Sequence, residues 1–218
     1  MYNIVIMGPQ GCGKGTQGER LAEKLGIPNV STGKLFRAEV ELNTGLGRDM
    51  AGFMQRGERV PSDIVYQVMT LRLSEQDVAE GVILDGYPRT LEQGESLDEI
   101  LTKLDRHLSH VVYLDISDDE AVRRLSGRRI CSNQKCELNY HVEFNPPKQD
   151  PDHCDRCGSP LRQRTDDVPD AIRRRLEIYH RDTEPLVDFY AQRGILRRVD
   201  GAQQIDKVQQ AVYDAVTK

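Results

Sequence analysis

The feature that most restricts the fold of this chain is a glycine-rich turn directly after an apolar run. Residues 2–7, Tyr-Asn-Ile-Val-Ile-Met, have the β-branched and apolar character of a buried strand. The turn Gly8-Pro-Gln-Gly-Cys-Gly-Lys14-Gly-Thr16 follows, and residues 17–25 continue at helical spacing. Glycines let consecutive backbone N–H groups face one anion, and a helix N-terminus adds positive potential. Strand, turn and helix therefore predict a phosphate-binding loop in which Lys14 supplies a mobile cation.

The rest of the chain alternates short apolar runs with helical patterns. Such an alternation predicts an α/β fold: a five-stranded parallel sheet with helices on both faces, the core of a P-loop NTPase. The further candidate strands are residues 29–30, 81–84, 110–116 and 195–199. The helical patterns cover residues 63–80, 91–108, 118–126, 169–192 and 204–216.

Two stretches interrupt this alternation and are expected to be insertions. Residues 31–60 carry short helical pieces, and residues 127–167 contain four cysteines and no convincing long helix. A structureless loop of roughly 40 residues inside a compact domain is improbable, so the second stretch needs a stabilising element of its own. The core would then consist of residues 1–30, 61–126 and 168–218.

Length and charge restrict the possible functions. The 218 residues suffice for one core with inserted lobes, and the net charge of −5 argues against a general nucleic-acid binder. No run of about 18 apolar residues is present, so no membrane-spanning helix is expected. The N-terminus lacks the basic start of a signal peptide, and we therefore expect a cytoplasmic protein.

A carboxylate is expected beside the phosphate-binding loop. The apolar run Val82-Ile-Leu ends in Asp85, and the carboxyl ends of strands are where open α/β sheets bind their ligands. A carboxylate there suits the organisation of Mg²⁺ near nucleotide phosphates. The residues that follow, Gly86-Tyr87-Pro88-Arg89-Thr90, make the motif specific.

Several motifs in order resemble those of nucleoside monophosphate kinases. They are the phosphate-binding loop, Ser31-Thr32-Gly33-x3-Arg37, and Asp85-Gly86-Tyr87-Pro88-Arg89-Thr90-x2-Gln93. Three later motifs, Arg124-x2-Gly127-Arg128-Arg129, Tyr140-His141 with Phe144-Asn-Pro-Pro-Lys148, and Arg164-x-Asp166-Asp167, narrow the resemblance to the adenylate kinases. The resemblance covers almost the whole chain, and it implies a small helical NMP-binding insertion at 31–60 and a lid at 127–167.

The resemblance also implies site residues at the matching positions. The residues near ATP would be Gly11, Cys12, Gly13, Lys14, Gly15, Thr16, Arg124, Arg128, Asn139, Tyr140 and Gln203. The residues near AMP would be Thr32, Arg37, Glu58, Arg59, Val60, Gly86, Tyr87, Pro88, Arg89, Gln93, Arg164 and Arg175. Transfer itself would depend on Lys14, Arg89, Arg128, Arg164 and Arg175, and Asp85 would organise Mg²⁺. Asp166 and Asp167 would pair with arginines when the lid closes.

The sequence departs from the family pattern at three places. Pro9-Gln10 reverses a common order in the loop, Lys34 stands where Asp is common, and Gln203 stands where some members carry Lys. None of the three removes an essential charge.

The cysteines of the second insertion have the spacing of a metal site. The run Cys131-x4-Cys136-x17-Cys154-x2-Cys157 resembles a Cys₄ zinc ribbon with an enlarged first turn. A structural Zn²⁺ would stabilise a β lid whose core is too small to fold rigidly. His141 or His153 in place of Cys136, and free or disulfide-bonded cysteines, remain alternatives.

The resemblance implies the Mg²⁺-dependent reaction ATP + AMP = 2 ADP. A monomer that binds no nucleic acid and no membrane is expected. A kinase for UMP, CMP or GMP is the alternative within the same class. A zinc-ribbon module for nucleic acid fused to a nucleotide switch is the alternative from another class, and the acidic net charge counts against it.

Overall fold

The computed structural model describes residues 1–55, 58–133, 136, 138–164 and 166–218. Both predicted insertions extend over residues outside these ranges, namely 56–57 in the first and 134–135, 137 and 165 in the second.

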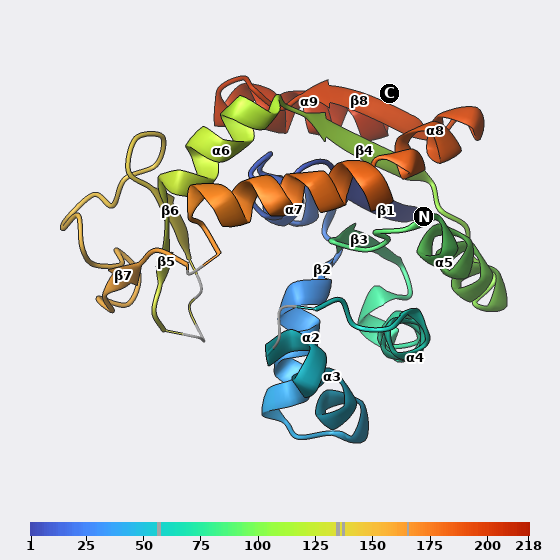
Figure 1. Cartoon of the computed structure of the whole chain (residues 1–218). Helices are drawn as coiled ribbons and strands as arrows, with labels where there is room; N and C mark the ends of the chain where they lie inside the picture. Colours follow the sequence, from blue (N-terminus) through green and yellow to red (C-terminus); the bar gives the residue numbers. More distant parts are fainter. Residues whose placement is uncertain (56–57, 134–135, 137, 165) are drawn as a thin grey trace.

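A five-stranded sheet lies at the centre of the molecule (Figure 1). Its strands are β1 (Tyr2–Met7), β2 (Asn29–Ser31), β3 (Gly81–Asp85), β4 (His110–Asp115) and β8 (Leu196–Asp200). They are ordered β2-β3-β1-β4-β8, and every neighbouring pair is parallel. This confirms the predicted parallel sheet. Because all strands run in one direction, their carboxyl ends meet at one edge, and the phosphate-binding loop and Asp85 both lie there.

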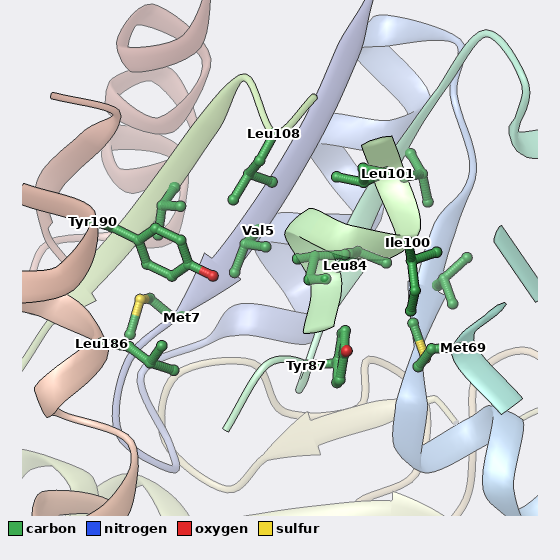
Figure 2. Packing of buried hydrophobic residues seen from close by; sticks show 14 of the residues in the cluster. Val5, Met7, Met69, Leu84, Tyr87, Ile100, Leu101, Leu108, Leu186 and Tyr190 are labelled. Atoms are coloured by element: carbon green, nitrogen blue, oxygen red, sulfur yellow. The ribbon is translucent and has the colours of Figure 1, made fainter. Parts of the chain in front are cut away.

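Helices cover both faces of this sheet, as predicted. They are α1 (Lys14–Leu25), α4 (Ser62–Leu73), α5 (Leu91–Lys103), α6 (Asp118–Ser126), α7 (Pro169–Asp182), α8 (Pro185–Gln192) and α9 (Ile205–Thr217). Alternate residues of β1 belong to different clusters: Val5 and Met7 pack with α4, α5 and α8, whereas Ile4 and Ile6 pack with α1, α6 and α9. Figure 2 shows the first cluster, in which Leu186 and Tyr190 of α8 face Val5 and Met7 of β1.

Three predicted helices are shorter or divided, each for a local reason. The pattern at 63–80 ends at Leu73, where the Ser74 hydroxyl donates to the Thr70 carbonyl, and a 3₁₀ turn, η1 (Gln76–Val78), follows. The pattern at 91–108 ends at Lys103 because Asp105 adopts φ 55° and the Arg106 amide donates back to the Leu101 carbonyl. The pattern at 169–192 divides before Pro185, whose ring and missing N–H interrupt a helix.

The two predicted insertions carry their own secondary structure. Within 31–60 lie α2 (Thr32–Glu41) and α3 (Gly45–Gln55). Within 127–167 a separate antiparallel sheet is ordered β6-β5-β7, with β5 (Arg128–Cys131), β6 (Asn139–His141) and β7 (Leu161–Arg162). Figure 1 shows this small sheet projecting from one side of the main sheet, and α2 and α3 from another. The predicted division into core, helical insertion and β lid remains a prediction about domains.

The described part of the chain contains no helix long and apolar enough to cross a membrane.

The packing of α5 gives a test of the core. Leu97→Ala removes a fully buried side chain from the cluster of Figure 2. It should lower the free energy of unfolding by about 2–5 kcal/mol because a cavity remains. Leu71→Ala on α4 is the matched control, since Leu71 is 63% exposed, and it should change stability by less than about 0.5 kcal/mol. Urea unfolding of both variants measures the difference, and equal effects would contradict this packing.

Candidate active site

The phosphate-binding loop joins β1 to α1. Lys14 is the first residue of α1, and its Nζ donates to the carbonyls of Gly8 and Pro9 at 2.7 and 2.8 Å. Gly8 has φ 145°, and a Cβ there would stand 2.4 Å from the Leu114 carbonyl oxygen of β4, so only glycine fits. The Lys14 ammonium therefore donates to neutral carbonyls close to the helix N-terminus. A phosphate bound there could replace these carbonyls as the acceptor.

Cys12 fills the inner side of this loop. Its side chain is buried, and its Sγ lies 3.6 Å from Lys14 Nζ. Burial raises the pKa of the Cys12 thiol more than the neighbouring Lys14 charge lowers it, so the group is a packed thiol at neutral pH.

Asp85 ends β3 next to the loop, as the sequence predicts. A Cβ added to Gly15 would stand 3.5 Å from Asp85 Oδ2, which places the carboxylate against the first turn of α1. Burial raises the pKa of Asp85, and the charges of Lys14 and Arg89 oppose that rise. The charges of two predicted catalytic cations therefore both favour the ionised form of this carboxylate.

The predicted acceptor residues gather on the other side of Asp85. The Thr32 hydroxyl donates to the Asp85 carbonyl at 3.3 Å, and Arg89 Nε donates to the Gly86 carbonyl at 2.8 Å. Gln93 Oε1 accepts from the Arg89 amide at 2.8 Å. The peptide between Tyr87 and Pro88 is cis. These contacts bring the segment 86–93 against the N-terminus of α2.

The remaining acceptor-side residues lie around this segment. Arg37 is on α2, and its Nη1 lies 3.4 Å from where a Cβ on Gly33 would stand. Arg59 Nη2 pairs with Asp182 Oδ2 at 3.0 Å, and Val60 packs against the larger core cluster. Glu58 directly precedes Arg59 in the chain.

Three predicted arginines share two carboxylates at the base of the lid. Arg128 donates through Nε and Nη2 to Asp167 at 2.8 and 2.6 Å, and Arg164 donates through Nε and Nη2 to Asp166 at 2.8 and 3.0 Å. Arg175 Nη1 lies 3.1 Å from an Asp166 carboxylate oxygen and 3.5 Å from one of Asp167. The Asp167 side chain is fully buried. The structure therefore brings Arg128, Arg164 and Arg175 together, with two internal anions between three cations.

The predicted ATP-side residues outside the loop do not form one cluster. Arg124 Nε donates to Glu120 Oε1 at 2.7 Å, and Gln203 Nε2 donates to Asp200 Oδ2 at 3.2 Å. The turn that holds Gln203 lies beside the loop, because a Cβ on Gly201 would stand 3.6 Å from the Cys12 carbonyl.

Two more predicted ATP-side residues lie on β6. Asn139 is exposed. The Tyr140 hydroxyl points into the lid, where it lies 3.4 Å from Cys154 Sγ and accepts from the Asp155 amide.

Sequence reasoning missed two contacts of the acceptor side. Asp182 pairs with Arg59, and the Thr183 hydroxyl donates to the Arg89 carbonyl at 2.9 Å. Both come from the junction between α7 and α8, which a helical pattern at 169–192 hides. The Pro185 that divides this pattern was the available signal.

The four lid cysteines form a cluster suited to a metal ion. Their sulfurs all lie within 4.8 Å of one another, with Cys131 3.4 Å from Cys157 and Cys136 3.7 Å from Cys154. Four thiolates about 2.3 Å from a tetrahedral Zn²⁺ are separated by about 3.8 Å, so the donor set fits. The five cysteines of the chain are free thiols.

Neither histidine considered as a replacement ligand belongs to this cluster. His141 Nδ1 accepts from the amides of Glu143 and Phe144, and His153 Nδ1 lies 2.9 Å from Asp150.

A parallel sheet with a phosphate-binding loop after its first strand, and with arginines supplied from an inserted lid, is the arrangement of P-loop kinases that phosphorylate nucleotides. The sequence profile of the adenylate kinases matches residues 6–195. The adenylate kinases of Methanothrix thermoacetophila and Methanosarcina barkeri are 44% and 42% identical over 216 residues. The alignments cover 99% of this chain in both cases, with 97% and 99% of the respective relatives. The adenylate kinase of a Geobacillus strain is 43% identical over 94% of each chain.

The chain therefore belongs to the adenylate kinase family. Its reaction is the reversible phosphoryl transfer ATP + AMP = 2 ADP, and the expected class of enzyme is confirmed.

The carboxylates of the arginine cluster give a pH prediction. Burial opposes ionisation of Asp166, but the Arg164 hydrogen bond and the charges of Arg175 and Arg128 hold its pKa below the ordinary value. An unfolded Asp titrates near about 3.9, so the ionised group stabilises the fold above about pH 4, and this stabilisation is lost as the pH falls through the folded pKa.

We therefore expect Asp166→Asn to lower the free energy of unfolding at pH 7, and the difference from the parent to shrink below about pH 3. Unfolding curves measured across this range check the slope. Asp170→Asn, at a carboxylate that is 98% exposed, is the control and should have little effect at either pH. A pH-independent loss in Asp166→Asn would contradict the assignment.

Proposed function

We propose that transfer takes place at the carboxyl ends of β1 and β3, with ATP phosphates on the loop 11–16 and the AMP phosphate near Arg89. The observation that carries this proposal is that Asp85 lies against the first turn of α1, which begins at Lys14, while the neighbouring Gly86 carbonyl accepts from Arg89. In phosphoryl transfer the protein contributes positioning and charge neutralisation rather than covalent chemistry. A site in which Lys14 and Arg89 donate to neutral carbonyls, close to the Asp85 carboxylate at the end of β3, meets that need.

Each cation has a distinct proposed role. Lys14 would leave the carbonyls of Gly8 and Pro9 for the β- and γ-phosphates of ATP. Arg128, Arg164 and Arg175 would exchange Asp166 and Asp167 for the transferring phosphoryl group and the acceptor phosphate. Arginine suits this exchange because its fork binds carboxylate and phosphate oxygens in the same bidentate way.

The acceptor pocket would be selective for AMP. Arg37 and Arg89 would hold its phosphate, Thr32 and the main chain of 58–60 and 86–88 would line the pocket, and Gln93 would read the adenine edge. Arg124, Asn139, Tyr140 and Gln203 would complete the ATP side. Asp166 and Asp167, released by their present partners, would pair with arginine groups on closure.

Mg²⁺ is the proposed cofactor with ATP, and Asp85 is the residue that would hold it. A carboxylate at a strand end beside the phosphate loop offers the hard oxygen ligand that Mg²⁺ prefers. The ion supplies neutralisation of phosphate charge. The carboxylate would orient the phosphates relative to Lys14, whose charge favours the ionised form of Asp85.

Closure of two insertions would exclude water from the reaction. Residues 31–60 would cover AMP, and residues 127–167 would cover ATP, moving on a core formed by 1–30, 61–126 and 168–218. Water at the γ-phosphate would hydrolyse ATP, so both covers are needed before transfer.

The lid metal is proposed to be structural Zn²⁺ bound by Cys131, Cys136, Cys154 and Cys157. Four protein ligands leave no open position for chemistry. We further propose a cytoplasmic monomer that acts on ATP and AMP and binds neither nucleic acid nor a membrane surface. The net charge of −5 supports the absence of a general nucleic-acid partner.

ADP formation from MgATP with AMP, UMP, CMP or GMP tests the acceptor assignment. A large rate with AMP alone is expected. Selectivity for another monophosphate would overturn the role of Gln93, and phosphate release without any acceptor would indicate an ATPase.

The same assay includes Lys14→Met, which should lower turnover by roughly 10²–10³ because the ammonium group that would donate hydrogen bonds to the ATP phosphates is lost. Lys207→Met, at an exposed position on α9, is the matched control and should turn over like the parent. Parent-like turnover in Lys14→Met would contradict the phosphate-loop assignment.

The metal proposal is tested by elemental analysis of the purified protein. Cys154→Ser should lose bound zinc and lower the melting temperature, because the lid core depends on the sulfur cluster. Cys12→Ser removes a buried cysteine outside the cluster and should keep the parent zinc content. One zinc per chain in Cys154→Ser would contradict the Cys₄ assignment.

A further inference from the structure

The junction between α7 and α8 reaches the acceptor side through two successive residues. The Thr183 hydroxyl donates to the main-chain carbonyl of Arg89 at 2.9 Å, across 94 positions of sequence. The preceding Asp182 pairs with Arg59 Nη2 at 3.0 Å. Asp182 and Arg59 line a cavity of about 420 Å³ together with Thr90. One short connection thus contacts both chain segments, 58–60 and 86–89, that carry the proposed acceptor residues.

Thr183 is itself held firmly. It is buried, its amide donates to the Tyr179 carbonyl at 2.8 Å, and its own carbonyl accepts from the Leu186 amide at 3.0 Å. Tyr179 and Leu186 are buried in the large core cluster. A hydroxyl fixed on both sides by two helices is a rigid donor, so it can set the position of the carbonyl it binds.

The Arg89 main chain has two such supports. Its amide donates to Gln93 Oε1 at 2.8 Å, and its carbonyl accepts from Thr183, so side chains from α5 and from the α7–α8 junction hold the same residue. The guanidinium Nε donates to Gly86 at 2.8 Å, within the same turn. If Gln93 binds the base of AMP, it leaves the Arg89 amide. The hydrogen bond from Thr183 would then be the one that still holds the Arg89 main chain.

We propose that Thr183 is a positioning residue for the acceptor side: its hydroxyl holds the Arg89 main chain so that the guanidinium is in place when AMP binds. The inference rests on the proposed role of Arg89 in AMP binding. Thr183 caps the end of α7, and Arg175 lies about 12 Å before it along the same helix, at 1.5 Å per residue. The helix therefore connects the residue that holds Arg89 to the arginine cluster at the base of the lid.

The test compares Thr183→Val, which removes the donor at nearly the same shape, with Thr183→Ser, which keeps it. Loss of one hydrogen bond predicts a KM for AMP that is about three- to tenfold higher in Thr183→Val. The KM for ATP should change by less than about twofold. Thr183→Ser should restore the KM for AMP to within about twofold of the parent.

Thr70→Val is the matched control, because Thr70 Oγ1 is buried and has no hydrogen-bond partner among the described residues. It should leave both KM values unchanged. If Thr183→Val does not fold, Thr183→Ala compared with Thr183→Ser gives the same contrast.

Two results would overturn the inference. One is an unchanged KM for AMP in Thr183→Val. The other is an equal rise in both KM values, which a merely structural role would produce. Arg89→Ala in the same assay shows whether a negative result concerns the positioning role of Thr183 or the proposed role of Arg89 in AMP binding. If Arg89→Ala loses AMP binding while Thr183→Val does not, only the positioning role is wrong, whereas parent-like AMP kinetics in Arg89→Ala would remove the basis of both.

Discussion

Several cations lie near one end of the sheet, and their mutual repulsion must be offset when no phosphate is bound. The rest of the site depends on which groups of the protein offset it. Two unit charges 4 Å apart repel by about 4 kcal/mol at an effective dielectric constant of 20. The protein supplies internal acceptors in place of phosphate. Lys14 donates to two carbonyls and Arg89 donates to one. The other three arginines form ion pairs with Asp166 and Asp167.

The two kinds of acceptor have different consequences for binding. In the proposed mechanism, phosphate would displace a neutral carbonyl from Lys14 or Arg89 and gain an attraction between opposite charges. Phosphate that displaces a carboxylate from Arg128 or Arg175 replaces one anion by another, so the net change is smaller. In this proposal the loop and the acceptor segment would attract phosphate most strongly, and the arginine cluster at the base of the lid would exchange one anion for another. An exchange with a small net gain suits a step that must reverse each time product leaves.

The sequence predicted what depends on local pattern and on matched motifs. The apolar runs gave five parallel strands, and the turn after residues 2–7 gave the loop around Lys14. It did not predict where helices end: Asp105 in a left-handed conformation and the Ser74 hydroxyl are local details that periodicity averages out. Nor did it predict the contacts of Tyr140 or Thr183, because each depends on a partner that only the fold brings near.

The connections of the lid restrict where it can move. His180, near the end of α7, bridges Asp118 at the start of α6 and Glu184, and the hydrogen bonds to Glu184 and Asp118 raise its pKa. The two helices that lead into and out of the lid are thus tied at the ends farther from it. The proposed lid movement would then occur at the near ends, where Gly127 ends α6 and Val168 precedes α7. A Cβ at Gly127 would stand 2.4 Å from His141 Nε2, so a side chain there would require the imidazole to move. Asp166 and Asp167, which bind the arginines of the cluster, lie immediately before Val168, so the proposed change of arginine partners would act on the segment at which the proposed lid would bend.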